Sequence, residues 1–323
     1  MTEAQRFVVS AEEAPVRLDV FLHRHLAGIS RSYVQRAIEN GQVFVGEKRR
    51  AKGYLLSPGD AVRLAGFVRP EDRTLAPNAS LVLPVVHEDA DFLVFDKPAG
   101  MPVHPNDFDD TGTVVNFLLA RYPEVVGIGE GVLRPGIVHR LDTGTTGLLL
   151  VARTAAGYAG LKRQFVERTM KKHYFALAMG DVAAPGRIET PLAHDPTNVK
   201  KMKVVTNAVE MASLHAREAL TEFEPWQRCG GKATLLWVAI KTGRMHQIRV
   251  HLASIGHPLC GDPLYQSAAQ KSLDPSKLAR PGLHATRLKL AHPTTGAPLL
   301  FESPLPSDLA AEAERLAKSA PAR

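Results

Sequence analysis

The sequence is poor in cysteine and has no long apolar stretch. Only two of its 323 residues are cysteines, Cys229 and Cys260, and no Cys-x-x-Cys pair occurs. This argues against a disulfide framework and a zinc site, and it fits a reducing cytosol. No apolar run approaches a membrane span, and the first residues do not resemble a secretory signal. We therefore expect a cytoplasmic protein that does not span a membrane.

Acidic residues are fewer than basic ones. The chain has 40 Lys and Arg against 33 Asp and Glu, a net charge of +7. This excess favours a polyanionic partner such as a nucleic acid, although many basic proteins bind none. The hydrophobic content of 45% can build a sizeable core, and the length suggests two domains.

The first 64 residues read as a small domain with its core at 17–64. An apolar face predicts one helix from about Leu18, and Ser30 is placed to cap a second helix that ends at Gly41. Residues 43–45 then predict a short strand, and Pro-Gly-Asp at 58–60 predicts a turn before a further strand.

This N-terminal segment is strongly basic. Residues 17–64 contain nine basic and four acidic side chains. A solvated helical face is the commoner explanation of such a run. However, Arg-Leu-Asp, Ser-Arg-Ser, Gly-Gln-Val-Phe-Val and Pro-Gly-Asp follow one another as in the alpha-L RNA-binding module, which this segment resembles. Gly46-Glu47 departs from the Asn-Gly usual there. The resemblance implies phosphate contacts, which position an RNA without reading its sequence, by Arg31, Arg36, Lys48, Arg49, Arg50 and Lys52.

The rest of the chain predicts an α+β domain. Residues 65–80 contain Pro70 and Pro77 and read as a linker. Residues 81–306 alternate short strands and a few helices: a hairpin at 83–95, a strand at 233–241 and a helix at 245–255 before Gly256. Residues 307–323 are rich in Ala and charge and read as a tail that could contain a short helix.

A single carboxylate stands in a glycine- and threonine-rich turn at 137–149. Asp142 is flanked by Gly144 and Gly147, and Arg140 precedes it by two residues. Such a loop can hold a carboxylate rigidly. The pattern is compatible with a nucleophile and with a structural ion pair.

Asp142 also begins the string Asp-Thr-Gly-Thr, which occurs a second time at Asp110. Aspartic proteases carry this string twice, and their two carboxylates share one proton. The two copies are too close in sequence for each to lie at the centre of its own lobe. The protease remains a remote alternative.

The predicted helix at 245–255 offers Asp142 a partner. Ile248, Leu252 and Ile255 form an apolar stripe, and Arg249 lies beside it. A half-buried Arg needs an anion, and Asp142 is a candidate.

Three histidines, His139, His246 and His251, lie close in sequence to Asp142 or Arg249. A metal site of His246 and His251 is disfavoured, because five residues turn a helix by about 500° and separate the two rings. We read His139 as a structural hydrogen-bonding group.

Separate motifs occur in the order found in the RluA-type pseudouridine synthases, which residues 81–306 resemble. They are Lys-Pro-Ala-Gly at 97–100, Val-His-Pro at 103–105, His-Arg-Leu-Asp at 139–142, Lys-His-Tyr-Phe-Ala-Leu at 172–177, Thr-Gly-Arg-Met-His-Gln-Ile-Arg-Val-His-Leu at 242–252, Gly-His-Pro at 256–258, Gly-Asp at 261–262, Leu-His-Ala at 283–285 and His-Pro at 292–293. Departures are Thr146, where Ser is usual, and Met245, where Thr or Ser is usual. The resemblance implies a mixed, mostly antiparallel sheet, and an alpha-L module in front is the arrangement of the ribosomal-RNA enzymes.

This resemblance also implies a reaction and roles. Uridine would be isomerised to pseudouridine by Asp142 without cofactor or metal, either by attack on the sugar or the base or by taking a ribose proton. Arg249 would pair with Asp142, Tyr174 would stack on the detached base and could assist proton removal, and Arg140 would fill the space left by the flipped uridine. The RluD branch is favoured, with 23S ribosomal RNA or the pre-ribosomal large subunit as partner of a monomer. The rival from another class is a non-catalytic RNA-binding protein of the same fold.

Overall fold

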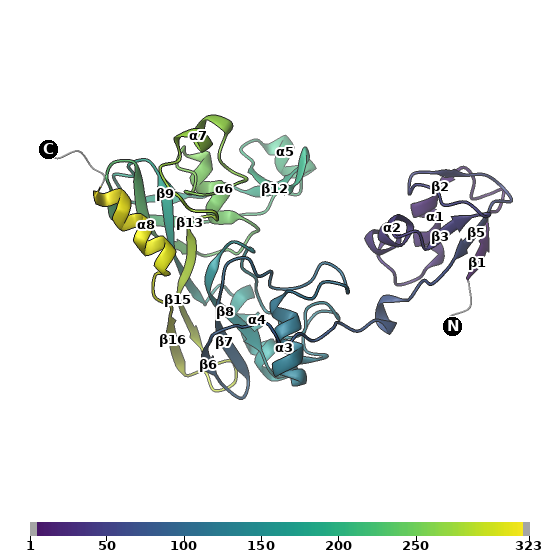
Figure 1. Cartoon of the computed structure of the whole chain (residues 1–323), viewed down its shortest axis with the longest axis horizontal. Helices are drawn as coiled ribbons and strands as arrows, with labels where there is room; N and C mark the ends of the chain where they lie inside the picture. The colour runs from purple at the N-terminus through teal and green to yellow at the C-terminus, as the bar shows by residue number, and fades with distance from the viewer. Residues whose placement is uncertain (1–4, 319–323) are drawn as a thin grey trace. The chain divides into compact units, whose positions relative to one another are not determined.

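The computed structural model describes residues 5–318, which form two compact units divided after Thr74 (Figure 1). The elements of the first unit are β1 (Arg6–Val8), β2 (Val16–Arg17), α1 (Leu18–His25), α2 (Arg31–Glu39), β3 (Val43–Val45), β4 (Leu55–Leu56) and β5 (Ala61–Leu64). The strands β1, β5 and β3 form one small sheet, and β2 pairs with β4.

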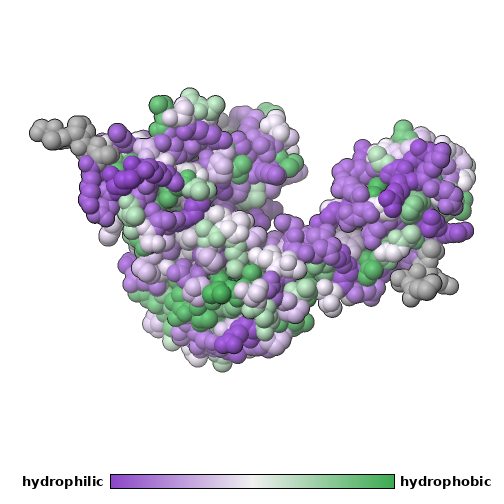
Figure 2. Space-filling view, viewed as in Figure 1, coloured by the Kyte–Doolittle hydropathy of each residue, from purple (hydrophilic) through white to green (hydrophobic). Residues whose placement is uncertain are grey.

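The two helices and the strands β3 and β5 of the first unit form where the sequence predicts them, whereas β1, β2 and β4 were not predicted. The Ser30 hydroxyl accepts a hydrogen bond from the Tyr33 amide and caps α2, and Gly41 takes a positive φ of 73° just after the helix. Leu18, Leu22 and Val34 are fully buried in a core between the helices and the sheet. The visible face of this unit is mainly hydrophilic (Figure 2).

The connection between the units is shorter than the linker expected at 65–80. Phe67 packs into the core of the first unit, and the Tyr33 hydroxyl donates to the carbonyl of Val68. On the other side Leu75 is buried, and Asn116 donates to the carbonyl of Ala76. A short 3₁₀ helix, η1 (Pro70–Asp72), lies between these anchored ends.

The second unit contains the central sheet. Its strands are β6 (Val85–Glu88), β7 (Phe92–Lys97), β8 (Thr146–Ala152), β9 (Lys171–Met179), β10 (Gly186–Ile188), β13 (Thr221–Cys229), β14 (Ala233–Ile240), β15 (Leu283–Ala291) and β16 (Pro298–Glu302). Within residues 5–318 they pair in the order β10-β13-β14-β9-β15-β8-β7-β6, with β16 also on β15. The pairing of β15 with β8 is parallel and the others are antiparallel, so the expected mixed, mostly antiparallel sheet is confirmed.

Helices and a separate hairpin complete this unit. They are α3 (Val114–Arg121), η2 (Pro123–Val125), α4 (Ala155–Val166), β11 (Leu192–Asp195), β12 (Asn198–Val204), α5 (Ala208–Ser213), α6 (Gln247–Ser254), α7 (Ala268–Leu273) and α8 (Ser307–Lys318). The strand β8 is buried along its whole length, and α4 packs on it. No helix among residues 5–318 is long and apolar enough to cross a membrane.

The helix α8 corrects the view of residues 307–323 as a tail. Leu309, Ala313 and Leu316 are at most 2% exposed and pack in the same core as Leu177 and Leu235. They recur at the spacing of one helix face, which buries apolar area against the sheet. Residues 307–318 are therefore part of the second unit, and residues 319–323 lie outside the described chain.

Candidate active site

The loop that carries Asp142 ends where β8 enters the sheet. The amide of Thr145 donates to the carbonyl of Asp142 at 3.0 Å, which closes a turn. At Gly147, φ is 107°, and a Cβ there would collide with the backbone of Ala285 on the parallel neighbour β15. The glycine thus permits the close strand pairing that fixes Asp142 at the edge of the core.

Arg249 binds Asp142 as expected, but it also has a second carboxylate partner. Its Nη1 donates to Oδ2 of Asp142 at 2.9 Å, while Nε and Nη2 donate to the two oxygens of Asp262 at 2.7 and 2.9 Å. The Asp262 side chain is fully buried and also accepts the amides of Leu264 and Tyr265. Asp262 therefore orients the guanidinium, and Arg249 in turn orients Asp142.

Arg249 is more deeply buried than the half-buried position that the sequence predicted. Its side chain is only 5% exposed, whereas Ile255, expected in the apolar stripe, is 43% exposed. The helix begins at Gln247, so the stripe is shorter than the predicted 245–255. Burial alone would lower the pKa of Arg249, but Asp262, and then Asp142, raise it above the usual range. Arg249 is thus a permanent cation.

Asp142 lies where two cavities meet. A cavity of about 230 Å³ is also lined by Tyr174 and Lys172, and an open groove of about 1140 Å³ is also lined by His104 and Lys200. Both are lined by Arg140 and Asp142. The Asp142 side chain is 23% exposed, and among residues 5–318 no group donates a hydrogen bond to its Oδ1. This oxygen is available to a bound substrate.

Tyr174 and Arg140 line the same cavity as Asp142. Tyr174 extends from β9 and is 7% exposed. Burial, together with the charge of Asp142, raises the pKa of its phenol, so the ring is neutral at neutral pH. A neutral phenol is a poor base, whereas the apolar face of the Tyr174 ring is suited to stacking on a nucleobase. Arg140 is exposed at the rim, beside Asp142.

Two buried lysines were not predicted as parts of this site. Lys97 is fully buried, and its ammonium donates to the carbonyls of Pro98, Met101 and Thr143, the residue after Asp142. Burial lowers the pKa of Lys97 to about 7, and Asp142 acts in the opposite direction. Lys172 lines the smaller cavity and is 7% exposed. Strand alternation from Tyr174 to Lys172 was the signal that could have placed Lys172 here.

The histidines have structural partners. His139 accepts a hydrogen bond from the Leu150 amide, in keeping with the structural role expected, and burial lowers its pKa to about 3. His251 is fully buried, and its two ring nitrogens lie within hydrogen-bond distance of the Thr221 hydroxyl and the Thr190 carbonyl. His246 lies 3.8 Å from Asp142. The two histidines of the metal alternative thus have separate partners.

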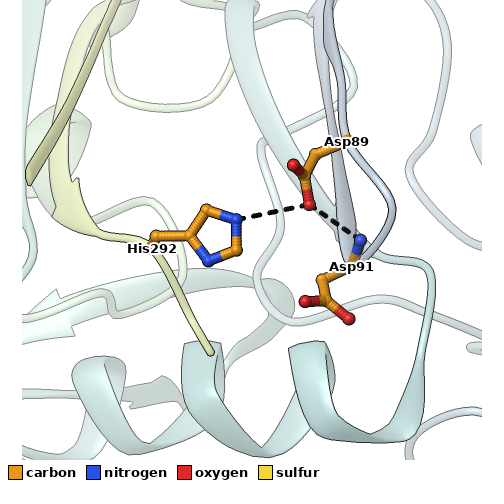
Figure 3. A group of neighbouring side chains, drawn as sticks. All are labelled: Asp89, Asp91 and His292. Carbon is orange, nitrogen blue, oxygen red and sulfur yellow. Dashed lines mark hydrogen bonds and ion pairs between the residues drawn. The ribbon is translucent and has the colours of Figure 1, made fainter. Parts of the chain in front are cut away.

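A cluster of possible metal ligands occurs elsewhere, at Asp89, Asp91 and His292 (Figure 3). Its groups are hydrogen-bonded already: Asp91 accepts the hydroxyls of Thr154 and Thr294, and Nδ1 of His292 accepts the amide of Thr294. Nε2 of His292 then carries the proton and faces Asp89 at 3.4 Å. The cluster ties the β6–β7 turn to the β15–β16 turn.

The second Asp-Thr-Gly-Thr string does not form a protease dyad with the first. The Asp110 carboxylate accepts the amides of Asn106 and Asp107 within its own turn. Asp142 is instead paired with Arg249. The remote alternative is therefore wrong.

The basic residues expected to contact phosphates lie at α2 and in the loop after β3. Lys48, Arg49, Arg50 and Lys52 are exposed. Several already have partners in the protein: the guanidinium of Arg50 lies 4.7 Å from the ring centre of Tyr54, and Lys52 pairs with Glu39 at 2.8 Å.

The two basic residues on α2 are also engaged within the protein. Arg31 donates at 2.9 Å to the buried Asp19, a structural contact that the sequence did not predict. The guanidinium of Arg36 lies 5.9 Å from the ring centre of Tyr33.

Comparisons with known proteins agree with this geometry. The model of the RNA pseudouridylate synthase family matches residues 91–254, and that of the S4 domain matches residues 16–62. Ribosomal large subunit pseudouridine synthase D of Nitrosomonas europaea is 40% identical over 92% of this chain and 83% of that protein. An uncharacterized RNA pseudouridine synthase of Bacillus subtilis, YlyB, is 38% identical over 96% of this chain and 97% of that protein.

A solved structure also has this fold. Human RNA pseudouridylate synthase domain containing 1 is 26% identical, with a TM-score of 0.56 over 71% of this chain and 86% of that one. The family model covers half of the chain, and its region includes Asp142, Tyr174 and Arg249. With a rigid carboxylate beside a buried arginine and an aromatic-lined cavity, the chain belongs to the RNA pseudouridine synthases and carries an S4 domain before its catalytic unit.

Proposed function

We propose that this enzyme isomerises specific uridines of large-subunit ribosomal RNA, with Asp142 as the reacting carboxylate. The observation that carries the proposal is the position of Asp142 at the junction of the two cavities. One oxygen is bound by Arg249, and the other has no protein donor among the described residues. The relative in Nitrosomonas europaea is named for the large ribosomal subunit, which supports this class of RNA.

The reaction needs neither redox chemistry nor a second substrate. The bond between N1 of uracil and C1′ of ribose breaks, a bond between C5 and C1′ forms, the proton of C5 leaves and N1 gains a proton. A carboxylate held as an anion can attack the sugar or the base, or take a ribose proton. Arg249 donates a hydrogen bond to Asp142 and orients it, so the geometry costs little to assemble at each turnover.

The target uridine must leave its stack before it can reach Asp142. In this proposal its base enters the cavity of about 230 Å³ and stacks on Tyr174. Arg140 occupies the space that the base leaves, while the adjoining RNA lies along the open groove that includes Lys200. Neither a cofactor nor a metal takes part.

The N-terminal unit adds affinity. The exposed side chains Lys48, Arg49, Arg50 and Lys52, with Arg31 and Arg36, contact phosphates and hold the RNA without reading its sequence. The enzyme acts as a monomer in the cytoplasm, on the RNA or on the pre-ribosomal large subunit.

Mapping of pseudouridines in ribosomal RNA tests this function. A strain that lacks the gene should lose pseudouridine at defined large-subunit positions, and the purified protein should restore it at the same positions in unmodified transcript. If the strain retains every site, or if only transfer RNA is altered, the proposed substrate is wrong. A purified protein that binds RNA but forms no pseudouridine would favour the non-catalytic alternative.

A further inference from the structure

The smaller cavity contains a second polar region besides Asp142 and Tyr174. Lys172 of β9 and Arg244, in the loop between β14 and α6, line it together with Thr145. The Thr145 hydroxyl is buried and has no hydrogen-bond partner among the described residues. Since unsatisfied buried polar groups are uncommon in folded proteins, these groups point to a polar ligand.

Lys172 is buried without a counter-ion. Its side chain is 7% exposed, and no carboxylate among residues 5–318 forms an ion pair with it. Its ammonium lies 5.3 Å from the ring centre of Phe165, and a Cβ at Gly243 would lie 3.5 Å from its Nζ. Burial lowers its pKa to about 8, and the charge of Arg244 acts in the same direction. An unpaired buried lysine lowers the stability of the free protein, which suggests a role in ligand binding.

Arg244 extends this positive region. Its Nε donates to the carbonyl of Glu218 at 3.0 Å. Burial lowers the pKa of Arg244, and Arg217 and Arg168 lower it further, while Glu218 opposes them. The Glu218 carboxylate is itself 3.5 Å from Arg168 and 82% exposed, so solvent weakens its effect. Lys172 and Arg244 therefore line the cavity together, and the charges of Arg217 and Arg168 also act on Arg244.

We propose that Lys172 and Arg244 bind a backbone phosphate of the flipped target nucleotide or of its immediate neighbour. This inference rests on the proposed function, because it assumes that a uridine enters the cavity. Uracil is neutral, so its carbonyl groups would leave the two cations uncompensated. A phosphate supplies a negative charge and several acceptor oxygens, and it is attached to the same ribose that must be held against Asp142.

This contact would position the ribose. Tyr174 and Lys172 are two residues apart on one face of β9, and both line the cavity that contains Asp142. The base and the phosphate are then bound by different groups of one cavity. Two such contacts fix the orientation of the anomeric carbon more tightly than base stacking alone.

Binding of in vitro transcribed large-subunit rRNA fragments, measured at several salt concentrations, tests the contact. All variants carry Asp142→Asn to prevent turnover. Lys172→Met should weaken binding about tenfold at low salt and lower the slope of log K against log salt by roughly 0.7–0.9, the value for one phosphate contact. Lys172→Arg should retain most of the slope. The matched control is Lys171→Met, because Lys171 is exposed on the opposite face of β9.

A synthetic hairpin with one neutral methylphosphonate at each position near the mapped uridine identifies the phosphate. At one position the methylphosphonate should weaken hairpin binding by the protein that retains Lys172. The same methylphosphonate should cause no further loss of affinity in the Lys172→Met protein. An unchanged salt slope for a folded Lys172→Met protein would overturn the proposal. The proposal would also be overturned if methylphosphonates at every position weakened RNA binding equally in both proteins. Weaker binding by Lys172→Met without a change in its salt slope would overturn it too, because that result indicates a contact with a base.

Failure of this contact can be told apart from failure of the proposed function. Pseudouridine formation by the unmodified protein is measured on the same fragments. If pseudouridine forms while Lys172→Met keeps the slope, only the phosphate contact is wrong. If no pseudouridine forms, the function is wrong, and the salt slopes still show whether Lys172 contacts a phosphate.

Discussion

Replacement of Arg249 by Met should destabilise the catalytic unit through Asp262 more than through Asp142. Arg249 makes two hydrogen bonds to Asp262, whose side chain is fully buried, and one to Asp142, whose side chain is 23% exposed. Breaking a buried pair typically costs about 3–5 kcal/mol, because the remaining charge is uncompensated. For a unit of this size, that corresponds to a fall in melting temperature on the order of 10 °C.

Two double-mutant cycles measured by urea denaturation separate these contributions. The cycle of Arg249→Met with Asp262→Asn should give a coupling energy of about 2–3 kcal/mol, near the upper end for residues in contact. The cycle with Asp142→Asn should give about 1 kcal/mol or less, since water screens the more exposed carboxylate. Equal coupling energies in the two cycles, or additivity for Asp262, would refute the view that Asp262 is the main anchor of Arg249.

Three further outcomes are expected. Substitution of the basic residues at 48–50 by Gln in the full chain should weaken rRNA binding and reduce its salt slope by roughly 0.7–0.9 per lost phosphate contact; an unchanged slope would exclude these side chains from the interface. Lys172→Met should raise the free energy of unfolding most below pH 8 and progressively less up to about pH 10.5, because the pKa of Lys172 falls from 10.5 to about 8 on folding, so the unfolded chain binds more protons in that window; a gain that does not depend on pH would contradict this. Activity should persist after treatment with EDTA, and loss that zinc restores would revive a metal site, at Asp89, Asp91 and His292 or elsewhere.

Local signals in the sequence were sufficient for much of the fold. The cap at Ser30 and the stop at Gly41 depend on contacts within a few residues, and local patterns also predicted β3 and β5. The strands β1, β2 and β4 were not predicted, and β1 pairs with β5, which is distant in sequence. The hairpin of β6 and β7 was predicted from the same kind of signal. The linker was predicted too long, because loop composition does not reveal that Phe67 packs into a core.

The site was predicted only where two strong patterns met. The glycine- and threonine-rich loop indicated Asp142, and the apolar stripe of the predicted helix indicated Arg249. Together they predicted the pairing of these two residues, which the structure contains. Asp262 was missed because it stands in a Gly-Asp turn whose contact with Arg249 is set by tertiary structure. By contrast, a short helix was allowed within 307–323, but its packing was missed: Leu309 and Leu316 recur at helical spacing, a signal that this helix has a buried face.

Tritium release from large-subunit rRNA labelled at carbon 5 of uridine measures the chemistry of Asp142 directly. Asp142→Asn keeps the shape of the side chain and removes its negative charge. The account predicts that this variant binds the RNA, melts close to the unmodified protein and releases no tritium above background. Release at the rate of the unmodified protein would contradict the assignment of Asp142 as the reacting carboxylate.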